Sequence, residues 1–259
     1  MKYIKIYLAC VRTSFSCAMA YRMDFILGNL ITLLSNVVIP LVTVLVYANG
    51  ASFPGWTMWE ALLIQSVFSM SGAVSSMVSG SILWVTMDNI QAGSFETVLL
   101  KPLSPLFYIT AANFSTGSFG LFLGSLAMTI VCAFHTGICG ASGVVLFLLL
   151  FVSGIAVMGG LDLIMAAISF KWVGNSRIPE IFGSIEEFGK YPLGIFPKAV
   201  QILSSMVIPV AVVGFFPASA LLGRLEPTAL AAIIPCILFL LFGIWLYNRM
   251  IKIYEGVGG

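Results

Sequence analysis

Charged side chains are scarce in this sequence. Asp, Glu, Lys and Arg make up 8% of the 259 residues and hydrophobic residues 60%, whereas soluble domains carry about a quarter of charged residues. One membrane span needs about 20 mostly apolar residues, so the chain has room for several spans and little else. The composition excludes a soluble catalytic domain and predicts an all-α polytopic membrane protein. The net charge of +2 is too small for a nucleic-acid-binding surface.

Residues that commonly carry catalysis are also few. His135 is the single histidine, and no metal site or hydrolytic triad can be assembled around it. The nearest imitation of a phosphate-binding loop runs from Gly183 to Gly189 and Lys190, but Tyr191 stands where the motif requires Ser or Thr. We therefore expect no catalytic residue, metal or cofactor in this chain, which by itself is not predicted to be an enzyme.

The five cysteines are odd in number and lie mostly in or beside apolar stretches, where a free thiol behaves as a small hydrophobe. Cys132 and Cys139 bracket a short predicted loop. They would pair only if that loop faced an oxidising compartment, so both states stay open at this point.

Apolar runs dominate what is present. Five of them are long enough to cross a membrane, and they cover residues 25–48, 58–84, 106–134, 143–170 and 228–249. Ahead of the first run, Ile4, Leu8, Val11 and Phe15 recur every three or four residues. This period predicts an amphipathic helix over residues 1–24 that lies in the membrane interface.

The segment 178–222 admits two interpretations. Hydropathy places a span at 199–217, with an interfacial helix before it. Alternatively, the chain crosses at 178–196, and 197–222 forms a re-entrant pair on the far side, which is tolerable only within protein or a water-filled cavity. Either interpretation brings the number of spans to six.

Basic residues near span ends predict the orientation, because Lys and Arg are retained on the cytoplasmic side. With the span at 199–217, Arg224 is the one basic residue on the outside. The basic residues that we place on the cytoplasmic side are Lys2, Lys5, Arg12, Arg22, Lys101, Lys171, Arg177, Lys190, Lys198, Arg249 and Lys252. The sequence thus predicts one permease domain over 1–259 with both termini cytoplasmic. We expect it in the cell membrane, of the bacterial cytoplasmic type.

Asp162 is the one acid well inside a confidently apolar run. An acid at that depth usually faces a cavity or a partner. It is either a polar point on a substrate path, which would suit an ion-coupled carrier or channel for cations, or a structural acid held by hydrogen bonds.

The charged, proline-punctuated stretch DNIQAGSFETVLLKPLSP, residues 88–105, separates the second and third apolar runs. Asp88 and Asn89 are expected to cap a short helix that Gly93 interrupts. The segment after Gly93 carries an apolar cluster together with Glu96 and Lys101, and Pro102 and Pro105 then end it. The apolar residues are Phe95, Val98, Leu99 and Leu100. This cluster predicts either a docking surface on a cytoplasmic loop, residues 87–105, or a segment that lies against the inner leaflet and the bases of the spans.

The motif IQAGSFETVLLKPLSPLF (90–107) resembles the first cytoplasmic loop of type-two ABC exporter permeases: a glycine, an acid three residues later, a leucine pair, then a basic residue, proline and serine. EEFGKYPLGIFP (186–197) and VIPVAVVGFFPASALLG (207–223) resemble the later part of the six-span branch of that family. The resemblance covers essentially the whole chain. Lys101 stands where arginine is more frequent, a change that preserves the charge.

The resemblance implies the membrane subunit of an ATP-driven exporter. Two permeases, identical or related, would form the path in membrane lipid, and separate ATP-binding subunits would hold ATP and Mg. The loop 87–105 would be a coupling helix, and by position its contacts to the ATPase would be Gly93, Phe95, Glu96, Leu99, Leu100, Lys101 and Pro102. The resemblance also favours extracellular re-entrant helices in the later chain.

Overall fold

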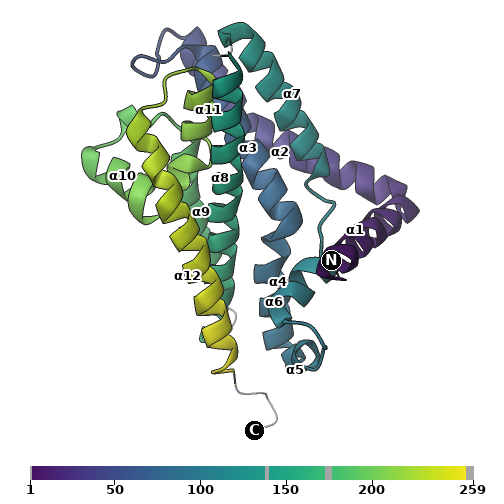
Figure 1. Cartoon of the computed structure of the whole chain (residues 1–259). Helices are drawn as coiled ribbons and strands as arrows, with labels where there is room; N and C mark the ends of the chain where they lie inside the picture. Colours follow the sequence, from purple (N-terminus) through teal and green to yellow (C-terminus); the bar gives the residue numbers. More distant parts are fainter. Residues whose placement is uncertain (1, 138–139, 173–176, 255–259) are drawn as a thin grey trace.

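The computed structural model describes residues 2–137, 140–172 and 177–254, and this part contains helices and no strand. The all-α prediction is confirmed. Figure 1 shows one helical bundle. Its α-helices are α1 (Lys2–Ala20), α2 (Arg22–Ala48), α3 (Met58–Val78), α4 (Gly80–Gln91), α5 (Phe95–Leu99), α6 (Pro105–Ala112), α7 (Phe119–Thr136), α8 (Gly140–Ser169), α9 (Arg177–Glu186), α10 (Lys198–Ile202), α11 (Phe215–Leu221) and α12 (Ile233–Ile251).

Five segments of the described chain are long and apolar enough to cross a membrane: α2, α3, α7, α8 and Ala229–Ile251, which includes α12. A bent pair, Lys198–Val207 with Val210–Leu221, would make a sixth. The prediction of a polytopic membrane protein is confirmed. We use "the α5 end" for the end of the bundle that carries α5, and "the opposite end" for the other.

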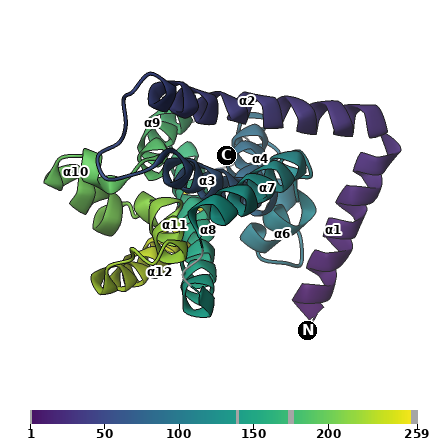
Figure 2. The ribbon, with the colours of Figure 1, turned by 90° about the horizontal axis from the view of Figure 1, so that it is seen from above.

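The first two helices lie at the edge of the bundle and meet at a corner (Figure 2). The predicted amphipathic helix 1–24 ends at Ala20, and Tyr21 forms the turn into α2. Aromatic contacts hold α1 against α6 and α7. The ring centres of Tyr3 and Phe107 of α6 are 5.0 Å apart, and those of Phe15 and Phe119 of α7 are 5.6 Å apart. Most of the large apolar side chains of α2 stay exposed, as a helix in contact with lipid or another subunit requires.

The bundle is centred on α3 and α8, with α12 packed along α8. Two glycines permit the close approach of α8 and α12: a Cβ on Gly243 would meet the Gly160 oxygen at 2.9 Å, and one on Gly160 would meet the Phe239 ring at 2.9 Å. Further along, Tyr247 contacts Phe170, with ring centroids 5.6 Å apart. Residues later in α8 contact residues later in α12, so the two helices run parallel.

Because α8 and α12 run in the same direction, the chain between them must return from the α5 end to the opposite end. It does so in pieces: α9, the short 3-10 turn Glu187–Lys190, then α10, a π-helical turn and α11. The pieces meet where Gly189 and Gly214 approach each other, since a Cβ on Gly214 would lie 2.6 Å from the Gly189 oxygen.

Neither 199–217 nor 178–196 is a continuous helix in this return path. The bent pair fits either a broken span or a re-entrant loop, so the re-entrant interpretation of 197–222 stays a prediction. Pro209 has no N–H to continue the helix. The chain bends there by 77° between Lys198–Val207 and Val210–Leu221.

Two other predicted spans are also interrupted. The run 106–134 was expected to be one helix, but α6 ends at Ala112 and α7 begins at Phe119. The run 58–84 breaks at Ser79, and α4 continues beyond it to Gln91. The prediction of a continuous third span is therefore wrong, because the intervening Asn, Ser, Thr and Gly compete with helical backbone hydrogen bonds.

The two breaks face each other and hydrogen-bond across the gap. The Ser115 amide donates to the Met77 carbonyl at 3.0 Å, and the Ser81 hydroxyl donates to the Asn113 carbonyl at 2.7 Å. From α2, Asn29 donates to the Thr116 carbonyl at 3.3 Å and accepts from the Gly120 amide at 2.6 Å. These partners replace the backbone hydrogen bonds that the breaks remove, which is the condition for breaking a helix within a membrane.

Candidate functional site

The loop between α4 and α6 lies at one extremity of the bundle (Figure 1). It begins with a left-handed Gly93, φ +65°, after which the Ser94 amide donates to the Asn89 carbonyl at 2.9 Å. This is the usual glycine termination of a helix. The predicted cap by Asp88 and Asn89 is wrong, because both residues lie inside α4. The Asn89 side chain instead accepts from the Ser94 hydroxyl at 2.9 Å.

The inward face of α5 is apolar and buried. Phe95 and Val98, three residues apart on the same face, are 0% and 4% exposed. The Phe95 ring lies 5.0 Å from Phe170, next to the end of α8, and 5.3 Å from Tyr254, just after α12. Phe95 is therefore enclosed by the permease itself in this structure, and its role as a contact residue stays a prediction.

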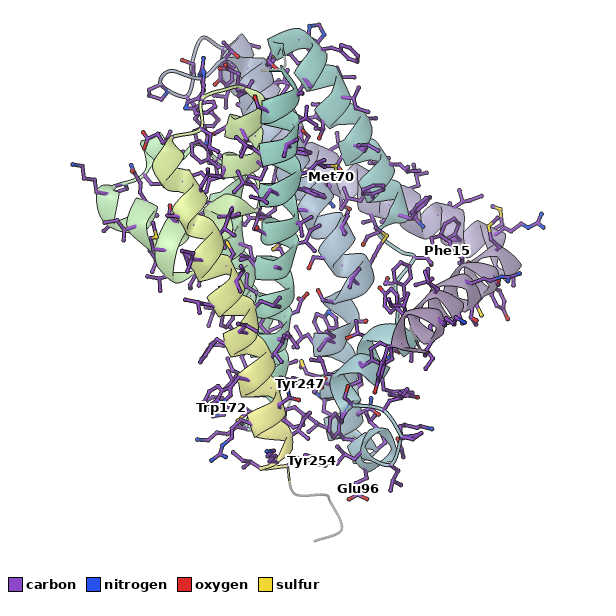
Figure 3. The ribbon with its side chains drawn as sticks, in the orientation of Figure 1. Phe15, Met70, Glu96, Trp172, Tyr247 and Tyr254 are labelled. Atoms are coloured by element: carbon purple, nitrogen blue, oxygen red, sulfur yellow. The ribbon has the colours of Figure 1, made fainter. Side chains whose placement is uncertain are left out.

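The outward face gathers the other predicted side chains. Leu100 is 84% exposed and Leu99 41%, and Glu96 and Pro102 are exposed beside them. Glu96 points away from the bundle in Figure 3. Lys101 lies with its Nζ 5.7 Å from the centre of the Tyr108 ring. The face is a small apolar knob with one acid and one base.

Asp162 lies on α8 opposite the break between α3 and α4. The Ser79 hydroxyl donates to its Oδ2 at 2.7 Å. Asp162 and Glu186 of α9 both line a cavity of about 260 Å³, together with Ser75 and Ser76. Sequence reasoning missed Glu186, because the return path of α9 beside α8 is not visible in a hydropathy pattern.

A family comparison bears on these features. A family model described as "ABC-2 family transporter protein" matches residues 33–258. The chain belongs to this family. It is a membrane permease of an ABC transporter, the transmembrane component and not the ATPase, and its family implies association with ATP-binding subunits. No curated protein is significantly similar to it.

The match includes the whole α5 loop and the segment 178–222 of the permease, and it begins after α1. The family resemblance seen in these motifs is thereby confirmed. Whether Cys132 pairs with Cys139 stays open, because Cys139 lies outside the described residues. Cys132 is fully buried in α7 as a free thiol.

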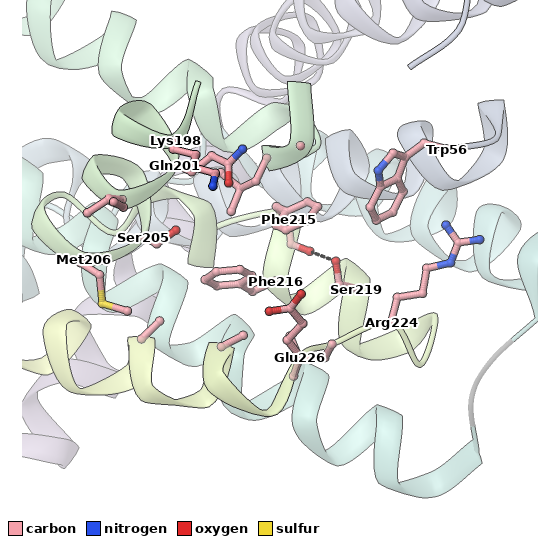
Figure 4. A pocket seen from close by; sticks show the side chains of 16 residues that line it. Trp56, Lys198, Gln201, Ser205, Met206, Phe215, Phe216, Ser219, Arg224 and Glu226 are labelled. Carbon is pink, nitrogen blue, oxygen red and sulfur yellow. Dashed lines mark hydrogen bonds between the residues drawn. The ribbon is translucent and has the colours of Figure 1, made fainter. Parts of the chain in front are cut away.

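A second, larger cavity of about 700 Å³ lies between α10, α11 and the chain that leads into α12 (Figure 4). Phe215, Phe216 and Met206 contribute apolar surface, and Arg224 lies at one side. Arg224 pairs with Glu60 at 2.9 Å and donates to the Gly55 carbonyl at 3.1 Å. Sequence reasoning missed this cavity, which is lined by residues from both arms of the 77° bend.

Proposed function

We propose that the chain is the permease of an ATP-driven exporter and that the outward face of α5 contacts the ATP-binding subunit. The observation that carries the proposal is the division of α5 into two faces. Phe95 and Val98 are buried in the permease, while Leu99 and Leu100 are exposed next to Glu96. An exposed apolar knob on a polar loop suits a protein groove better than water.

Charge supports a cytoplasmic location for this knob. Lys101 follows α5, Lys171 follows α8, and Arg249 and Lys252 lie at the end of α12. The contacts of Phe95 bring these ends together. Basic residues are retained on the cytoplasmic side, so we place the α5 end there, with both termini and with the partner that holds ATP and Mg.

A second permease is part of the proposal. The apolar side chains along α2 include Ile31, Leu34 and Val38, all more than half exposed. A second copy or a related permease would cover part of this surface and complete the translocation path, and membrane lipid would cover the rest.

Complex formation tests the role of α5. Leu100→Asp or Glu96→Arg should prevent copurification of the ATP-binding subunit with the tagged permease, because one change places a charge in the contact and the other reverses one. Asp88→Arg is the matched control: Asp88 is also exposed, but it lies on α4 and not on α5. Copurification of the ATP-binding subunit with all three variants would reject the contact.

A second candidate function follows from the cavity at Asp162. Two carboxylates, Asp162 and Glu186, line it, and such a site suits an ion-coupled carrier or channel for cations. This function predicts that the purified chain alone, in vesicles with a cation gradient, transports the cation and that Asp162→Asn abolishes the flux. Absence of cation flux in vesicles that hold the wild-type chain alone would reject it.

A further inference from the structure

Four aromatic rings join α5 to the ends of two long helices. The ring centre of Phe95 in α5 lies 5.0 Å from that of Phe170 and 5.3 Å from that of Tyr254. Phe170 in turn lies 5.6 Å from Tyr247 of α12 and 6.0 Å from Tyr254. We refer to Phe95, Phe170, Tyr247 and Tyr254 as the ring cluster. All four of these pairs meet edge to face, an arrangement with preferred geometry that resists rotation of one ring against the next.

We propose that Phe170 and Tyr254 are positioning residues that carry displacements of α5 to α8 and α12 when the ATP-binding subunit moves. This inference rests on the proposed contact between α5 and that subunit. It assigns a role to side chains that lie apart from the outward face of α5, on the segments that follow α8 and α12. Phe95 is then the part of the coupling motif that faces the permease, which explains why a motif residue is fully buried.

The backbone alone is a poor route for such a displacement. The arms that carry α5 are α4 and α6, and each arm ends in a break: at Ser79 on one side and at residues 113–118 on the other. A continuous helix transmits a push along its hydrogen bonds, whereas a break allows the two parts to change their angle. The breaks are therefore the points at which the hairpin α4–α5–α6 would change its angle to α3 and α7, so a displacement of α5 need not travel along the backbone into either helix.

The ring cluster connects the hairpin to α8 and α12, and it lies nearer the α5 end than those breaks do (Figure 1). One further link supports it, because the Thr86 and Tyr247 hydroxyls hydrogen-bond at 3.0 Å and so tie α4 to α12. Tilting of the hairpin must move α8 and α12, or else separate closely packed rings. Interfaces of this kind have discrete arrangements and do not deform continuously.

Tyr254 offers a sharp substitution. Its hydroxyl is buried and makes no hydrogen bond to any residue in the described part of the chain. The ring, and not the hydroxyl, is therefore what the cluster requires. Tyr254→Phe keeps the ring, and Tyr254→Ala removes it.

The test uses the permease copurified with its ATP-binding subunit and measures ATP hydrolysis. Tyr254→Ala and Phe170→Ala should each lower kcat by about fivefold or more, because the movement of the subunit during hydrolysis is then no longer matched by movement of the bundle. The KM for ATP should not change, since ATP binds to the partner, and copurification should stay at the wild-type level.

Two variants serve as controls. Tyr254→Phe should hydrolyse ATP at the wild-type rate. Phe242→Ala removes a different ring, which stacks on Trp245 with ring centres 5.8 Å apart on an exposed face of α12, and should also leave kcat unchanged.

The outcomes separate this inference from the function on which it rests. Failure of the wild-type permease to copurify with an ATP-binding subunit would reject the proposed function itself. With the complex formed, a wild-type kcat in both alanine variants would overturn the role of the ring cluster. Loss of the Tyr254→Ala permease from the membrane, or of its complex, would also overturn it, because the rings would then only stabilise the fold.

Discussion

Two apolar stretches of similar composition fold differently in this permease. Helix α8 runs without interruption over Gly140–Ser169, although it contains four internal glycines and an acid, Asp162. The run 106–134 has no acid, yet it breaks at residues 113–118. The difference lies in the neighbours: polar groups on α2, α3 and α4 bind the freed backbone of the second stretch, and a single serine binds the acid of the first.

Polarity within an apolar run therefore does not by itself decide where a helix breaks. A helix keeps its backbone bonds when an offending side chain finds a partner, as Asp162 does with Ser79. It gives them up where both side chains and backbone find other partners, as at Ser115 and Asn113. Gly154 and Gly160 of α8 permit close packing, since a Cβ on either would lie 2.9 Å or less from a neighbouring segment.

The largest effect should come from filling a glycine of α8. A Cβ on Gly154 would lie 2.7 Å from the Val212 oxygen and 2.9 Å from the Val213 Cα, both backbone atoms. Gly154→Ala should lower the free energy of unfolding by about 3 kcal/mol, since the return path would have to move. The melting temperature in detergent would show this as a large decrease. Gly28→Ala is the control, as that glycine of α2 has open space, and a decrease of equal size there would contradict the packing role.

A smaller loss of stability should follow when the hydrogen bonds from α2 to the break at residues 113–118 are removed. Asn29→Ala removes one donor and one acceptor, to Thr116 and Gly120, and leaves backbone groups without partners. Its expected cost is about 2 kcal/mol, measured as a decrease in melting temperature. Asn36→Ala is matched, because Asn36 bonds only one turn back in its own helix, to Thr32. Equal melting temperatures of the two variants would show that the break needs no support from α2.

The smallest of the three effects should follow from Ser79→Ala. It removes the hydroxyl that donates to Asp162, at a cost of about 1 to 2 kcal/mol, because the carboxylate loses a hydrogen bond away from bulk water. Ser153→Ala on the exposed side of α8 removes only a bond to Leu149 of the same helix and should be nearly neutral. Ser79→Ala with the wild-type melting temperature would mean that Asp162 does not depend on Ser79.

Much of the fold was predictable because apolar length is a property of the chain alone. Helices α2, α8 and α12 begin and end near the predicted positions, whereas the runs 58–84 and 106–134 are interrupted. The short helix α5 lies between the second and third runs. Its inward face was not predictable. Phe95 and Leu100 look equally apolar in the sequence, yet Phe95 is buried by Phe170 and Tyr254, which are distant in the chain.

The candidate site at Asp162 was likewise predictable only in part. The acid itself was visible as an exception within an apolar run, while its neighbours were not. Ser79 and Glu186 reach it only because α3 breaks at that level and α9 turns back beside α8. Each event depends on contacts between segments far apart in the sequence.

The sequence by itself determined the class of protein and the approximate positions of most apolar helices, since these follow from composition and run length, and its motifs indicated the family by resemblance. Tertiary structure alone decided where helices break, which face of α5 is exposed, and how the chain between α8 and α12 returns. The physical reason is that every buried polar group needs a partner, and every close approach needs space, and both are supplied by residues that only the folded chain brings together.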